Sequence, residues 1–167
     1  MGGYMASCQE TRQKAFDRKL KESYDKLQTM GDKAGFVYVA VHDVWPQYSK
    51  IGCTKDPIQR IKTYSTYDPV DCYKLVVYKL VDNMREYEKE IHTFLSDLRM
   101  NSEWFNLAWT TAAGIIHAES YEQKAYILTK ALSSSRLGTY RKRDYLPANR
   151  KMCKLTRQHS YSVSPAA

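Results

Sequence analysis

The stretch from Phe36 to Arg60, FVYVAVHDVWPQYSKIGCTKDPIQR, constrains the fold more than any other part of the chain. It begins with a short apolar run rich in valine, which is typical of a strand buried on both faces. A turn-prone link containing Pro46 separates this run from a second short segment, Tyr48 to Cys53. Asp56 and Pro57 then have the types expected of an N-cap and a first helical residue. The sequence therefore predicts a hairpin followed directly by a helix.

This arrangement predicts that three polar side chains meet. Tyr38 lies on the first expected strand, Lys50 on the second, and Arg60 on the first turns of the helix. A tyrosine on a buried strand is most often only a core residue, and an arginine on an amphipathic helix is most often only a surface residue. The spacing between the three residues is what favours a shared site.

Several short motifs, in their order and spacing, resemble the core of the GIY-YIG nuclease superfamily. Phe36-Val37-Tyr38 stands where that family has G-I-Y, Lys50-Ile51-Gly52 stands where it has Y-I-G, and Arg60 follows ten residues after Lys50. Two further motifs are similar to the subgroup found in phages and large DNA viruses, namely Glu88-Lys89-Glu90-Ile91-His92 and Glu103-Trp104-Phe105. Such features in the right order make the match more specific than any single tripeptide.

The resemblance implies an α+β fold, with a three-stranded, mostly antiparallel sheet flanked by helices at residues 34–108. It also implies a metal-dependent endonuclease that hydrolyses DNA phosphodiester bonds. Such a reaction needs an activated water and neutralisation of the developing negative charge. The implied cofactor is Mg²⁺ or Mn²⁺, hard ions that prefer oxygen ligands.

Glu88 is the candidate metal ligand. On the predicted helix it lies at the edge of the apolar stripe, one turn before Ile91 and His92, so it can point into a cleft. A surface glutamate is the commoner fate of this residue type, and the match to the family's glutamate favours the metal. Arg60 would hold the phosphate in a bidentate manner, and the Tyr38 hydroxyl would orient the attacking water.

Lys50 is the main departure from the superfamily pattern, which has tyrosine there. A lysine can neutralise phosphate charge but cannot replace a phenol in proton transfer. Tyr48, two residues earlier on the same strand face, is the candidate for the missing hydroxyl. The departures at Lys50 and Phe36 also motivate an alternative: a catalytically weak or inactive nucleic-acid-binding module of the same fold.

The remaining candidates have supporting roles. His42 continues the Tyr38 face, His92 follows Glu88 by one turn, and either could assist proton transfer, although a core-edge or capping histidine is equally consistent. Gly52 and Asn106 are expected to support the site structurally. Glu103 and Trp104 are interpreted as fold markers, with Trp104 in the core.

The positive charge is concentrated at the C-terminus. Of the net charge of +8, the residues from Arg136 onward contribute +7. A basic segment interleaved with tyrosines suits contacts with phosphates and bases, although a solvated tail that only aids solubility is the simpler alternative. The predicted DNA-binding residues are Arg136, Arg141, Lys142, Arg143, Arg150 and Lys151.

The rest of the chain extends the predicted core. Residues 1–31 contain an amphipathic helix, expected from Glu10 to Met30, which either packs on the domain or forms a homodimer contact. A C-terminal helical region is expected at residues 109–135, with a break near Gly114 and Ser120, followed by the basic tail at 136–167. A regulatory or protein-interaction role, suggested by the added N-terminal helix, is the third interpretation.

Composition excludes several classes of protein. The longest apolar run is far too short to span a bilayer, so no membrane partner is expected. Residues 1–10 have no basic start and no apolar block, and we expect no secretory leader. The four cysteines are widely spread without metal-ligand spacing, so we expect free thiols. These features predict an intracellular protein, cytoplasmic or nuclear.

Overall fold

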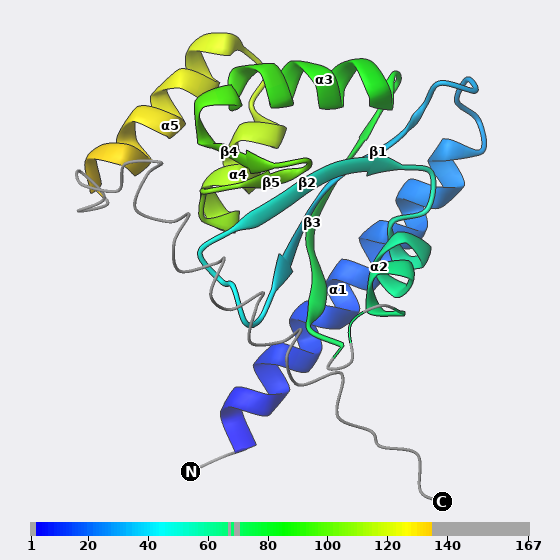
Figure 1. Ribbon diagram of the computed structural model, residues 1–167. Helices are drawn as coiled ribbons and strands as arrows, with labels where there is room; N and C mark the ends of the chain where they lie inside the picture. Colours follow the sequence, from blue (N-terminus) through cyan, green and yellow to red (C-terminus); the bar gives the residue numbers. More distant parts are fainter. Residues whose placement is uncertain (1–2, 67, 69–70, 135–167) are drawn as a thin grey trace, which may run out of the picture. The chain divides into compact units, whose positions relative to one another are not determined.

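The predicted hairpin and helix form the centre of the fold (Figure 1). The structure is a computed structural model that describes residues 3–66, 68 and 71–134. Strand β1 (Gly35–His42) pairs antiparallel with β2 (Ser49–Thr54), with Tyr38 opposite Gly52. Helix α2 (Pro57–Ser65) follows, and the Asp56 side chain accepts a hydrogen bond from the Gln59 amide. The predicted hairpin, helix and N-cap are therefore confirmed.

The sheet has five strands in the order β3-β1-β2-β5-β4, and all of its pairings are antiparallel. β3 (Tyr73–Val81) flanks β1, whereas β4 (Arg99–Asn101) and β5 (Trp104–Phe105) form a short hairpin beside β2. The α+β class is confirmed, but the prediction of three strands is wrong. A short strand is expected from the sequence at residues 103–107, where β5 lies, but the three residues of β4 are too few to show the alternation that identifies a strand.

Helices cover both faces of the sheet (Figure 1). α3 (Met84–Phe94) and α4 (Trp109–His117) lie on one face and contribute the fully buried side chains of Ile91, Ile115 and Ile116. α1 (Gly3–Leu27) and α2 lie on the other face. There Phe16 of α1 packs against Tyr78, and Tyr24 packs against Phe36. Burial on both faces explains why β1 is almost continuously apolar.

The helix boundaries differ from expectation at both ends of the chain. α1 begins at Gly3 rather than Glu10, because residues 4–9 contain neither proline nor glycine to interrupt the helix. The C-terminal helical region divides into α4 and α5 (Tyr121–Ser134) at residues 118–120, so the break expected near Ser120 is confirmed, whereas Gly114 lies inside α4 and does not interrupt it. A 3-10 turn, η1 (Ser96–Leu98), connects α3 with β4.

The chain divides into two units, Met1–Ile127 and Leu128–Ala167. The first unit contains the sheet, α1 to α4 and the first turns of α5. Of the second unit, the structure describes the last turns of α5, residues 128–134. No helix in the described part of the chain is both long enough and apolar enough to cross a membrane.

Candidate active site around the edge of β2

Two tyrosines are paired under α2. The hydroxyl oxygens of Tyr38 and Tyr64 lie 2.6 Å apart, and Tyr38 is 1% exposed. Gly52, opposite Tyr38 on β2, provides the room for this hydroxyl, because a Cβ atom at Gly52 would lie 2.7 Å from it. Tyr64 stands one helical turn after Arg60, on the same side of α2. Arg60 is exposed and lies near enough to both phenols to stabilise their ionised forms.

The two phenols differ in acidity. Burial, followed by the hydrogen bond with Tyr64, raises the pKa of Tyr38 far above its ordinary value. Burial also raises the pKa of Tyr64, but the hydrogen bond with Tyr38 acts in the opposite direction and lowers it. Tyr64 is therefore the more acidic of the two phenols, but the pKa values of both are raised and both are protonated at neutral pH.

Lys50 is a nearly buried cation with a carboxylate partner. Its ammonium nitrogen lies 2.7 Å from Oε2 of Glu103, and its side chain is 11% exposed. The same nitrogen lies 4.8 Å from the centre of the Tyr64 ring and 5.7 Å from that of Trp104. The Tyr64 hydroxyl donates to the same Glu103 oxygen at 3.5 Å. Glu103 therefore holds both Lys50 and Tyr64 in place.

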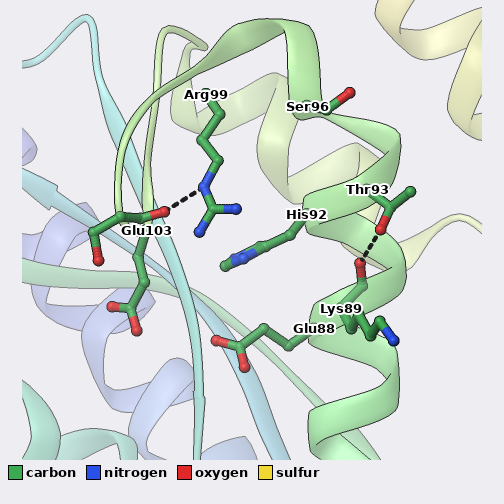
Figure 2. Close-up of a pocket in the computed structure, with 8 residues that line it drawn as sticks. Glu88, Lys89, His92, Thr93, Ser96, Arg99 and Glu103 are labelled. Atoms are coloured by element: carbon green, nitrogen blue, oxygen red, sulfur yellow. Dashed lines mark hydrogen bonds between the residues drawn. The ribbon is translucent and has the colours of Figure 1, made fainter.

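Glu88 lines an open pocket of about 570 Å³ between α3 and the β4–β5 hairpin. Figure 2 shows Glu88, His92, Arg99 and Glu103 pointing into the same space. Oε2 of Glu88 accepts a hydrogen bond of 3.1 Å from the thiol of Cys53 on β2. Burial, followed by this contact, raises the pKa of Cys53 to about 12. The Cys53 side chain is therefore a neutral hydrogen-bond donor to Glu88.

The group formed by Tyr38, Tyr64 and Lys50 lies on one face of β2, and Glu88 lies on the opposite face. Because side chains alternate along a strand, Lys50 and Gly52 face Tyr38, whereas Cys53 faces Glu88 on α3. Glu103 lies at the edge of β2, where its carbonyl accepts a hydrogen bond from the Ile51 amide. It contacts Lys50 and lines the Glu88 pocket, so it connects the two groups. The structure thus brings Tyr38, Lys50 and Arg60 together on one face of β2 and Glu88 to the other face, so the expectation that all four line one pocket is wrong, and Glu103 is the residue that contacts both groups.

His92 and Asn106 connect backbone segments around this edge. Nε2 of His92 donates a hydrogen bond of 2.9 Å to the carbonyl of Ile51, and the His92 ring also lines the Glu88 pocket. The backbone amide of Asn106 donates to the carbonyl of Leu98 at 2.8 Å, which fixes the end of β5 against η1. Both residues therefore help to hold α3 and the short hairpin beside β2.

His42 and Tyr48 do not line the pocket of Glu88. His42 is buried at the end of β1, where Nε2 lies 3.3 Å from Oδ2 of Asp68. His42, Asp68 and Cys72 bring ligand-type atoms within 4.8 Å of one another. However, Nδ1 of His42 accepts from the Val44 amide, so Nε2 carries the proton, which favours a hydrogen-bonded pair over metal ligation. Tyr48 is buried just before β2, and the hydroxyl that Tyr38 contacts is that of Tyr64.

Sequence reasoning missed Tyr64 altogether and assigned Glu103 only a role in the fold. Tyr64 had one available signal, its position four residues after Arg60 on the same helix. Glu103 had none beyond its place in a motif, because its contact with Lys50 depends on the pairing of Lys50 with Trp104. The predicted tail contacts, Arg136, Arg141, Lys142, Arg143, Arg150 and Lys151, lie outside the described residues.

Comparison with known proteins supports the resemblance found in the sequence. Residues 35–119, which include every element from β1 to α4, match the T5orf172 domain. Searches of curated proteins and of solved structures gave no match. The matched region spans half of the chain and contains Tyr38, Lys50, Arg60, Glu88 and Glu103. The chain therefore belongs to the T5orf172 domain family, a GIY-YIG-like, nuclease-associated family.

Proposed function

We propose that this protein is a metal-dependent endonuclease that hydrolyses DNA phosphodiester bonds at the edge of β2. The observation that carries the proposal is the single connected group formed there. Lys50 and the Tyr38–Tyr64 pair are joined through Glu103 to the pocket that Glu88 lines. Cations, phenols and carboxylates in contact provide phosphate binding, proton transfer and metal ligation within one small region.

Glu88 and Glu103 provide the donor set for the metal. Both carboxylates line the same open pocket, and the carboxylate of Glu88 accepts a hydrogen bond from the neutral thiol of Cys53. Carboxylate oxygens beside open space for water fit Mg²⁺ or Mn²⁺, which bind few protein ligands and keep several waters. When bound, such an ion neutralises phosphate charge and lowers the pKa of a coordinated water.

The protein's own residues have separate roles in this reaction. Exposed Arg60 binds a phosphate oxygen pair through its planar fork, and Lys50 neutralises further negative charge on the phosphate. Tyr64 takes the proton of the attacking water while its own proton passes to Glu103, the carboxylate to which its hydroxyl already donates. The water oxygen then forms a bond to phosphorus as the bond to the leaving sugar oxygen breaks.

A plasmid-nicking assay with and without Mg²⁺ or Mn²⁺ tests the proposal. We expect wild-type protein to nick supercoiled DNA only with metal, and Glu88→Gln and Arg60→Ala to lose at least about a hundred-fold in rate. Glu122→Gln removes an exposed carboxylate of α5 and is the matched control, which should nick at the wild-type rate. Equal, metal-independent nicking by all four proteins would contradict the proposal.

One observation favours a second candidate function, a nucleic-acid-binding module that does not cut. The residue at the place of the second motif tyrosine is Lys50, and Glu103 already compensates its charge. In that case the wild type and Glu88→Gln would bind a DNA duplex with equal affinity and neither would nick it. Metal-dependent nicking that Glu88→Gln abolishes would reject this alternative.

A further inference from the structure

A continuous cluster of aromatic side chains lies where β1 ends and β2 begins. Trp45, in the loop between these strands, lies 6.4 Å from Trp104, measured between ring centres. Trp104 lies 6.1 Å from Tyr73, and Tyr73 lies 5.2 Å from Tyr64. These four residues, here called the aromatic cluster, lead from an exposed loop to the Tyr38–Tyr64 pair of the candidate active site.

Trp45 is exposed and yet held in a fixed orientation. It is 39% exposed, and one face of its ring stacks on His42 at 4.4 Å with an angle of 25° between the planes. His42 itself is buried and is held on both of its ring nitrogens, by the Val44 amide and by Asp68. A large ring that is prepositioned and open to solvent loses little conformational entropy when a flat ligand stacks on it.

Two cationic side chains lie beside the aromatic cluster, Arg60 and the Lys50 that is paired with Glu103. The Lys50 ammonium is 5.7 Å from the Trp104 ring centre and 4.8 Å from that of Tyr64, and Arg60 stands one turn before Tyr64. Cationic side chains next to exposed aromatic rings are an arrangement that binds single-stranded nucleic acid, because each base has a flat face and each nucleotide has a phosphate.

We infer that Trp45, with Trp104 beside it, forms a binding site for an unpaired nucleobase of single-stranded DNA. A strand whose phosphate lies at Lys50 passes the aromatic cluster within a few nucleotides. The inference takes from the proposed function only this placement of the phosphate. In a duplex, the bases are already stacked on their neighbours and cannot use Trp45, so the site selects unpaired segments such as flaps, gaps or frayed ends.

Substitutions of Trp45 separate ring stacking from general effects on the fold. Trp45→Leu keeps an apolar side chain but removes the flat ring, whereas Trp45→Phe keeps a ring. Trp109→Leu is the matched control, since Trp109 is 41% exposed and lies on α4. The probe is a fluorescein-labelled oligothymidylate, titrated in EDTA at fixed salt and followed by anisotropy. A duplex of the same length, and an oligouridylate, are titrated in parallel.

We expect Trp45→Leu to weaken oligothymidylate binding by about five-fold or more, and Trp45→Phe to retain most of the affinity. Trp109→Leu should bind as the wild type does, and duplex binding should not depend on Trp45. Unchanged oligothymidylate binding by Trp45→Leu would overturn the inference, as would an equal loss in duplex binding. Tighter binding of the oligouridylate than of the oligothymidylate would overturn the assignment to DNA. Thermal melting of each variant identifies a loss caused by unfolding, in which case Trp45→Phe decides.

The same proteins distinguish this inference from the proposed function. If Trp45 contributes to single-strand binding but the wild type does not nick DNA with metal, the stacking site stands and the nuclease proposal falls. If the wild type nicks DNA and Glu88→Gln does not, while Trp45→Leu binds every probe normally, the nuclease proposal stands and the stacking site falls.

Discussion

The contact between Cys53 and Glu88 makes the thiol a reporter of the candidate metal site. The Cys53 thiol donates a hydrogen bond to Oε2 of Glu88, so the negative charge of Glu88 disfavours the thiolate. Removing that charge in Glu88→Gln should lower the pKa of Cys53. Binding of Mg²⁺ by Glu88 should have the same effect, because the cation offsets the same charge.

The expected size of the effect follows from the pKa. Burial, then Glu88, raises the pKa of Cys53 from 9.0 to about 12. Each unit changes the thiolate fraction tenfold, so at pH 8 the wild-type thiol should react roughly a thousand-fold more slowly than an ordinary thiol. Burial is the larger cause and persists in the variant. We therefore expect Glu88→Gln to restore only part of the reactivity, a gain of roughly tenfold.

Alkylation by iodoacetamide, followed by mass spectrometry, measures this rate. Serine replaces Cys8, Cys72 and Cys153 so that Cys53 is the only thiol. Glu88→Gln should react faster than its parent, and Mg²⁺ should accelerate the parent but not the variant. Equal rates with and without Glu88 would refute the contact. Acceleration by Glu88→Gln without any response of the parent to Mg²⁺ would refute Glu88 as the metal ligand.

Three further predictions follow from single contacts. Gly52→Ala places a methyl group 2.7 Å from the buried Tyr38 hydroxyl, so urea unfolding should show a loss of about 1–3 kcal/mol. Tyr64→Phe removes the proton acceptor and the hydrogen-bond partner of the buried Tyr38 hydroxyl, so metal-dependent nicking by the folded protein should fall by roughly a hundred-fold or more, and urea unfolding should show a loss of about 1–3 kcal/mol. Burial acts to raise the pKa of Asp56, but the hydrogen bonds that it accepts outweigh burial and lower it. Its capping stability is therefore present above pH 3.8 and is lost as the pH falls below that value. Asp56→Ala should cost about 1 kcal/mol at neutral pH, and urea unfolding should show the difference from wild type disappearing in acid.

Local signals explain what the sequence could predict. The hairpin, the N-cap at Asp56 and the first helix each depend on residues that are close together in the chain. Once the hairpin is assumed, antiparallel pairing places Lys50 near Tyr38, and the following helix returns Arg60 to the same face. The grouping of these three side chains was accessible from sequence because it needs only short-range geometry.

Long-range pairing explains what the sequence could not predict. β4 and β5 consist of three and two residues, and their hairpin turns at Ser102, which has a positive φ of 51°. Nothing in so short a segment indicates that it pairs with β2. The position of Glu103 between Lys50 and the pocket of Glu88 depends on that pairing.

The pairing of β2 with β5 also gives a physical reason for the lysine at position 50. A nearly buried ammonium group is costly unless an opposite charge compensates it, and Glu103 supplies that charge from the residue before Trp104. A tyrosine at this position would leave Glu103 in the same place without its cation. The Lys50-Ile51-Gly52 and Glu103-Trp104-Phe105 motifs therefore form one structural unit, although fifty residues of chain separate them. The lysine is not simply a tyrosine that has been lost, because it is the counter-charge of an acidic residue that lines the candidate metal pocket.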